Sequence, residues 1–148
     1  MRELNRNALV PYTPEQMFAL VDDIARYPEF LPWLSAAEEL RRADCERIGR
    51  LTIARAGLHG QFTTRNTVVP PDRLEMRLVD GPFKVLEGNW TFDAVRDDRG
   101  AVRGTRIALQ MRFEFKSRTT EILLGGMFES SCDKLVDAFT QRARAIYA

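Results

Sequence analysis

The chain has 148 residues and is 45% hydrophobic, enough for one sizeable core, so we expect a single domain spanning residues 1–148. Its 22 Lys and Arg against 21 Asp and Glu leave a formal net charge of +1. That balance supplies no overall field for steering onto nucleic acid, and we predict no DNA partner. Two cysteines, Cys45 and Cys132, form neither a disulfide framework nor a metal-binding spacing. No stretch approaches the roughly 18 apolar residues that span a bilayer, and no signal peptide is visible, so we expect a cytoplasmic protein.

The N-terminal segment predicts a strand followed by a helix. Residues 2–10 end in an apolar run, and Pro11 stops the strand. Thr13 can cap a helix that begins at Pro14, and Gln16 completes a capping box. Apolar residues spaced three to four apart then continue the helix to Ile24.

Residues 27–33 combine two prolines with four large apolar side chains. Prolines at this spacing permit at most a short helical turn. So crowded a segment must pack on the core or form the lip of a cavity. We assign Phe30, Leu31 and Trp33 to that lip.

From about residue 36 to residue 116 the hydrophobic period changes to two. Apolar side chains alternate with polar ones along residues 86–94 and again along residues 107–116. One solvent-exposed face is typical of an antiparallel sheet whose other face is covered. Turn sequences at residues 70–72, 80–82 and 97–100 separate the strands, and we expect about seven strands in all.

The period returns to helical after Lys116, and residues 119–147 contain no proline. We predict one long C-terminal helix, because no other element is large enough to cover the sheet. Gly125 and Gly126 each cost about 1 kcal/mol relative to Ala, which predicts a bend, a later helix start or a close approach. The predicted fold class is α+β, a helix-grip architecture. It has two short helices after the first strand and a curved antiparallel sheet around the long helix.

Residues suited to catalysis are scarce. His59 is the only histidine in the sequence, and it lies in a turn-like segment. No Gly-x-Ser-x-Gly motif, phosphate-binding glycine loop or second histidine for a metal pair is present. Neighbouring carboxylates at positions 22–23 and 38–39 fall at surface-like positions. We therefore expect no catalytic residue, no cofactor and no metal ion.

Aromatic and Met side chains gather on the face of the sheet that is predicted to be covered. Ligand pockets are mostly apolar and aromatic, and Met adapts to irregular ligands, although the same residues would also build an ordinary core. Arg65 and Asn66 lie mid-sheet, so one of them must face inward, where it pairs within the protein or meets a polar ligand group. The candidate ligand-binding residues are Phe30, Leu31, Trp33, Phe62, Arg65, Asn66, Phe83, Trp90, Phe92, Met111, Phe113, Met127, Phe128 and Leu135.

Several strings carry a family resemblance that runs almost end to end. They are residues 12–18, 21–23, 27–33, 62–66, 80–90 and 113–115, together with Phe139, Arg142, Ala143 and Tyr147. The chain resembles the coenzyme Q-binding and RatA ribosome-association toxin family of the START-like (polyketide cyclase-like, SRPBCC) superfamily. The strings at 27–33 and 81–90 are the most specific. Leu34 departs from the pattern, because many relatives carry Cys there.

The resemblance implies a helix-grip fold with an apolar cavity or tunnel. Eukaryotic members are implicated in binding ubiquinone and supporting respiration. Our leading interpretation is therefore a non-catalytic carrier of ubiquinone or a related polyprenyl lipid, with possible peripheral contact with the membrane. The quinone ring would meet Trp90, Phe92 and either Arg65 or Asn66, and the tail would run along residues of the last strand and helix.

The bacterial toxin member is implicated in binding the large ribosomal subunit and blocking assembly of the whole ribosome. This second interpretation requires an electropositive patch, because phosphate contacts dominate affinity for RNA. Two stretches offer one, although acidic neighbours dilute the first; they are Arg41, Arg42, Arg47, Arg50 and Arg55, and Arg142 with Arg144. A third interpretation, an aromatase/cyclase as in other branches of the superfamily, needs polar groups inside the cavity, and the sequence offers few.

Overall fold

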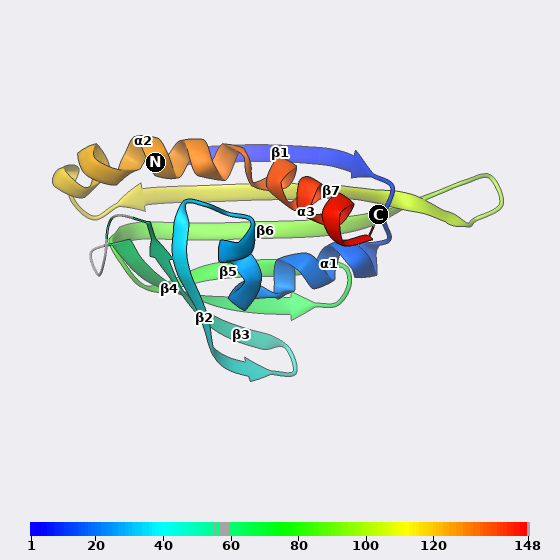
Figure 1. Cartoon of the computed structure of the whole chain (residues 1–148), viewed down its shortest axis with the longest axis horizontal. Coiled ribbons are helices and arrows are strands. Elements are labelled where there is room, and N and C mark those ends of the chain that lie inside the picture. The colour runs from blue at the N-terminus through cyan, green and yellow to red at the C-terminus, as the bar shows by residue number, and fades with distance from the viewer. Residues whose placement is uncertain (55, 57–59, 148) are drawn as a thin grey trace.

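Seven antiparallel strands form one curved sheet in the order β1-β7-β6-β5-β4-β3-β2 (Figure 1). The computed structural model describes residues 1–54, 56 and 60–147. The first strand pairs with the last, which leaves β1 and β2 at the two edges of the sheet. The predicted seven-stranded antiparallel sheet is confirmed. Its strands are β1 (Arg2–Val10), β2 (Leu34–Ala43), β3 (Glu46–Ile53), β4 (Gln61–Val69), β5 (Arg73–Asp80), β6 (Phe83–Arg96) and β7 (Val102–Phe115).

Two short helices follow β1, as predicted. Helix α1 (Pro14–Asp22) begins at a complete capping box, in which the Gln16 amide donates to the Thr13 hydroxyl and the Thr13 amide donates to the Gln16 side chain. A 3-10 helix, η1 (Ile24–Glu29), comes next and contains Pro28. The chain then enters β2 through the lip segment, residues 30–33.

The C-terminal helix is interrupted, so the prediction of one long helix is corrected. Helix α2 (Arg118–Asp133) and helix α3 (Leu135–Tyr147) are separated by Lys134, whose amide donates to the carbonyl of Ser131 instead of continuing the α-helical pattern. Residues 130–133, Ser-Ser-Cys-Asp, are weak helix formers, which explains a break without proline or glycine. The break lets the two helices follow the curvature of the sheet (Figure 1).

The alternation of apolar and polar residues along each strand decides which face of the sheet the helices cover. On β7, residues Ile107, Leu109, Met111 and Phe113 are buried against the helices, while their neighbours point outward. The β1–β7 edge closes tightly, because a Cβ at Gly104 would lie 2.3 Å from the carbonyl oxygen of Val10. Within the described ranges, no helix is both long enough and apolar enough to cross a membrane.

Candidate functional site: an apolar hollow beneath the helices

A single stripe of side chains from the two C-terminal helices faces the sheet. Phe128 and Cys132 on α2, and Leu135 and Phe139 on α3, follow helical spacing across the break. Phe128 is the centre of one aromatic cluster, with Phe62, Phe83, Phe113, Phe115 and Trp33 around it at centroid distances of 5.0 to 6.1 Å. Phe139 is the centre of a second cluster, with Tyr27, Phe30 and Trp90 at 5.1 to 5.5 Å.

Between the two clusters lies a hollow of about 50 Å³. None of the described residues that line it is charged. An apolar cavity of about 150 Å³ holds benzene and stays dry when empty. The hollow is therefore too small for a quinone ring, and it is far too small for a polyprenyl tail. It is lined by Tyr27, Leu31, Trp33, Leu34, Leu51, Phe62, Met76, Leu86, Trp90, Met111, Phe128, Cys132, Leu135 and Phe139.

The lip lines one side of the hollow. Leu31 is 2% exposed and points inward, and Trp33 stands edge-on to Phe128. Arg142 of α3 holds the lip from outside: its guanidinium donates to the Glu29 carboxylate at 2.7 Å and lies 5.0 Å from the centroid of the Phe30 ring. Both contacts tie the lip to α3, so a ligand larger than the hollow requires this segment to move.

The polar atoms at the hollow are held by the protein itself. The Tyr27 hydroxyl donates to the carbonyl of Val21, and burial raises its pKa, with Asp22 and Asp23 raising it further. Burial likewise raises the pKa of the Cys132 thiol. Both groups therefore stay protonated at neutral pH, and neither is activated as a base or a nucleophile.

The structure places half of the predicted ligand-binding residues around the hollow. The residues that line it are Leu31, Trp33, Phe62, Trp90, Met111, Phe128 and Leu135. The remainder lie elsewhere. Phe83 and Phe113 pack against Phe128, Phe92 packs on Phe18 of α1, and Phe30 packs on Phe139. Met127 is 37% exposed and lines a separate pocket with Pro32 and Trp33.

Arg65 and Asn66 take opposite faces of β4. Asn66 is buried at 4% exposure, where it accepts a hydrogen bond from the Thr64 hydroxyl. Arg65 points outward, with its Nε 3.5 Å from the Glu46 carboxylate. The sequence left this choice open. Asn66 is the inward-facing residue, and it pairs within the protein, with Thr64. Arg65 does not line the hollow.

Asp22 is not the solvated surface carboxylate that its sequence position predicts. Asp22 is buried at the end of α1, where its carboxylate accepts from Arg47 at 3.1 and 3.3 Å and from Arg42 at 3.2 Å. Arg47 is 7% exposed and belongs to the inward-facing row of β3, with Leu51 and Ile53. The period-two pattern of β3 was the signal that could have placed Arg47 inside, in need of a partner.

Internal partners also occupy most of the predicted basic patches. Arg50 pairs with Glu38, Arg41 with Glu46, and Arg142 with Glu29. Arg55 and His59 lie outside the described residues. A different pair lies on the outer face of the sheet: Arg65 on β4 is directly opposite Arg77 on β5. Arg77 forms no ion pair with any residue that the structure describes.

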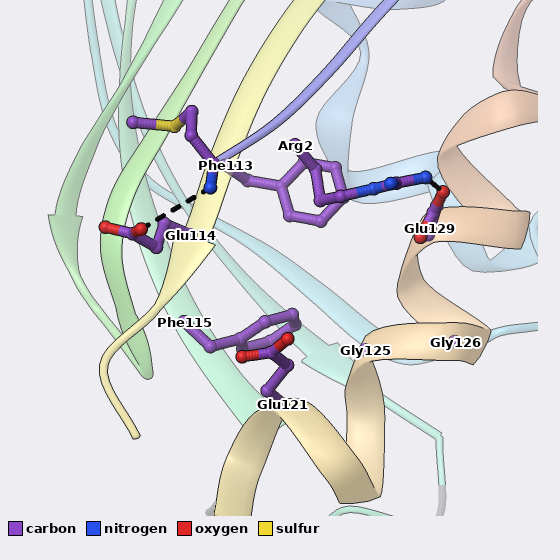
Figure 2. A pocket seen from close by; sticks show the side chains of 9 residues that line it. Arg2, Phe113, Glu114, Phe115, Glu121, Gly125, Gly126 and Glu129 are labelled. Carbon is purple, nitrogen blue, oxygen red and sulfur yellow. Dashed lines mark hydrogen bonds and ion pairs between the residues drawn. The ribbon is translucent and has the colours of Figure 1, made fainter. Parts of the chain in front are cut away.

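An open groove of about 320 Å³ lies between α2 and the β1–β7 edge (Figure 2). Its walls carry Glu114, Glu121 and Glu129, of which Glu129 pairs with Arg2 and Glu114 with the N-terminal amino group. Gly125 and Gly126 form the helix side of the groove, and α2 runs through them without a bend or a late start. A Cβ added at Gly125 would lie 3.7 Å from Phe115. A Cβ added at Gly126 would have no heavy atom within 4 Å. Packing therefore demands neither glycine.

Residues 10–140 match a family model described as polyketide cyclase / dehydrase and lipid transport. The chain belongs to this family. It is 40% identical over 147 residues to the ribosome association toxin RatA of Vibrio cholerae, covering 99% of both chains. It is 26% identical to the mitochondrial coenzyme Q-binding protein COQ10 of Drosophila melanogaster, covering 97% of this chain and 59% of that protein.

The fold is shared with solved structures of other proteins. The crystal structure of the Zhui aromatase/cyclase from Streptomyces sp. R1128 matches 99% of this chain and 96% of its own, with a TM-score of 0.82 and 15% identity. At that identity the likeness shows the fold alone, and it confirms the predicted helix-grip class.

Proposed function

We propose that this chain associates with the large ribosomal subunit through its outer surface and blocks formation of the whole ribosome, without catalysing a reaction. The observation that carries the proposal is the full-length similarity to RatA, a protein named for ribosome association. The small interior volume supports it, because a hollow of about 50 Å³ leaves the outer surface as the place for binding a partner. The neutral lining, with Tyr27 and Cys132 both protonated, supports binding rather than catalysis.

The outer face of the sheet supplies the charge that such binding needs. Like charges directly opposite each other on neighbouring strands destabilise a sheet, yet Arg65 and Arg77 are placed in that way, with Glu46 beside Arg65 and Glu87 opposite Arg77 on β6. Arg73 lies on the same outer face of β5 and is also exposed. Guanidinium groups bind phosphate in a bidentate manner, so a backbone phosphate of ribosomal RNA between Arg65 and Arg77 would relieve their repulsion.

Sucrose-gradient sedimentation with purified large subunits tests the proposal. The wild-type protein is expected to migrate with the subunit, and its overexpression is expected to reduce whole ribosomes and arrest growth. The double variant R65Q/R77Q is expected to bind more weakly and to lower the slope of log affinity against log salt by about one to two. The control R99Q/R144Q removes the same charge from exposed positions on the β6–β7 loop and α3, and it should leave binding nearly unchanged. Absence of co-migration by the wild-type protein would contradict the proposal.

Carriage of an apolar ligand is the second candidate function, and the uncharged lining of the hollow favours it. A polyprenyl quinone would require the lip to leave α3, with loss of the contacts that Arg142 makes to Glu29 and Phe30. Mass spectrometry of lipid extracted from the purified protein tests this function. A stoichiometric quinone in the extract would restore the carrier interpretation, and an extract without lipid would remove it.

A further inference from the structure

The first half of α2 exposes apolar side chains that the core does not use. Ile122 is 73% exposed and Leu123 is 74% exposed, more than any other large hydrophobic residue that the structure describes. Met127, one turn after Leu123, is 37% exposed on the same side. A helix that covers a sheet normally turns such residues inward, so this part of α2 has two apolar faces. We name Ile122, Leu123 and Met127 the α2 outer face.

Basic side chains border the α2 outer face. Lys116 and Arg118 lie at the start of α2 and are exposed, and Arg118 is one helical turn before Ile122. Lys84 is 72% exposed and lies at the same end of the sheet, since the Lys116 amide donates to Pro82 at 2.9 Å. Lys134 lies beyond the far end of α2, beside Pro32 and Trp33. Lys116 and Lys134 therefore lie at the two ends of this helix, whereas Lys84 lies on β6.

The acidic side chains of the region are turned the other way. Glu121 and Glu129 lie on the side of α2 that faces the groove in Figure 2, where Arg2 pairs with Glu129. Glu114 alternates with Phe113 and Phe115 on β7, so its side chain points away from α2, and it pairs with the N-terminal amino group. Lys84 pairs with Glu114 at 3.8 Å, so its amino group lies toward the outward face of the sheet. The α2 outer face is thus apolar in its centre and basic at its border.

We propose that the α2 outer face docks on the surface of an anionic lipid bilayer. Apolar side chains at the centre of an amphipathic helix enter the boundary between headgroups and acyl chains, while lysine stems extend so that their amino groups reach lipid phosphate. Ribosomal RNA would satisfy the lysines and leave Ile122 and Leu123 without an apolar partner. The Arg65–Arg77 pair lies on the opposite side of the sheet, so this surface is separate from the one assigned to the ribosome.

Vesicle flotation with the full chain tests the proposal. The wild-type protein is expected to float with phosphatidylcholine vesicles that contain phosphatidylglycerol and to float poorly with phosphatidylcholine alone. The variant I122Q/L123Q keeps good helix formers and should lower the bound fraction about tenfold on anionic vesicles. The matched control L9Q/V79Q changes apolar residues that are 63% and 49% exposed on the sheet, and it should bind as the wild type does. K116Q/R118Q should weaken binding to anionic vesicles and reduce its dependence on salt.

Three results would overturn the proposal. The first is a wild-type protein that does not float with anionic vesicles, and the second is an equal loss in L9Q/V79Q. The third is loss of a dimer or of subunit co-migration in I122Q/L123Q with vesicle binding intact, which would assign the face to a second copy or to the ribosome. Failure of ribosome association in the wild-type protein would not affect the flotation result, so the two proposals fail separately.

Discussion

Replacing Asp22 by Asn removes the one carboxylate that serves both Arg42 and Arg47. Arg47 is the critical partner, because its side chain is 8% exposed and donates two hydrogen bonds to the Asp22 carboxylate, at 3.1 and 3.3 Å. Its remaining bonds go to the carbonyls of Ala43 and Glu46, which carry no charge. The substitution therefore leaves a buried guanidinium without a counter-ion, at the point where α1 and the lip meet β3.

The expected cost is large for a single substitution. Removing one partner of a buried ion pair costs about 3–5 kcal/mol, whereas the Arg42 contact adds at most about 1 kcal/mol because its side chain is 45% exposed. A domain of this size is stable by about 5–15 kcal/mol. With a urea slope of about 1–3 kcal/mol per molar, the unfolding midpoint should fall by more than about 1 M.

Equilibrium urea unfolding of Asp22→Asn and Asp23→Asn provides a matched comparison of neighbouring carboxylates. Asp23 is 48% exposed and pairs with Arg26 alone among the described residues, so its substitution should cost less than about 1 kcal/mol. Equal midpoints for the two variants would refute the reasoning, since they would mean that Arg47 is satisfied without Asp22.

Thiol titration with a disulfide reagent should detect Cys45 at once and Cys132 only after unfolding, because Cys45 is exposed and burial raises the pKa of the Cys132 thiol. Gly126→Ala should stabilise the protein by up to about 1 kcal/mol, while Gly104→Ala should destabilise it by about 2–3 kcal/mol; thermal unfolding that ranks them the other way would contradict the packing. Hydrogen bonds from the amides of residues 101 and 99 lower the pKa of Asp97, so their stabilisation of the β6–β7 loop is full above the ordinary carboxyl range. This stabilisation is lost as the pH falls through the lowered pKa of Asp97. In that pH range, amide hydrogen exchange in the loop should accelerate in the wild-type protein but not in Asp97→Asn.

The alternation of polar and apolar residues was sufficient to predict the sheet and its covered face, and the capping box with the helical spacing after it predicted the helix that follows the first strand. Half of the candidate residues line the hollow because inward-facing positions on β6, β7 and α2 follow directly from their periods. The helix break at Lys134 was missed, since weak helix formers at residues 130–133 lower propensity without forbidding a helix.

Two further features could not be derived from periodicity. The volume between the helices and the sheet depends on how side chains interdigitate, so an aromatic lining looks the same in a packed core and in a lipid tunnel. The Asp22–Arg47 pair joins residues 25 positions apart on different elements, and one sequence gives no direct signal of such a contact. Likewise, the position of Arg65 opposite Arg77 follows from strand register, which the hydrophobic pattern alone leaves open here.

Filling the hollow without touching the outer surface tests most directly whether this protein binds its partner from outside. Cys132→Leu places two additional methyl groups into a space of about 50 Å³ lined by apolar side chains. The account predicts that the folded variant sediments with the large ribosomal subunit as the wild-type protein does, while R65Q/R77Q is released at lower salt. Loss of subunit association in folded Cys132→Leu, with R65Q/R77Q unaffected, would contradict it and would place the function inside the fold.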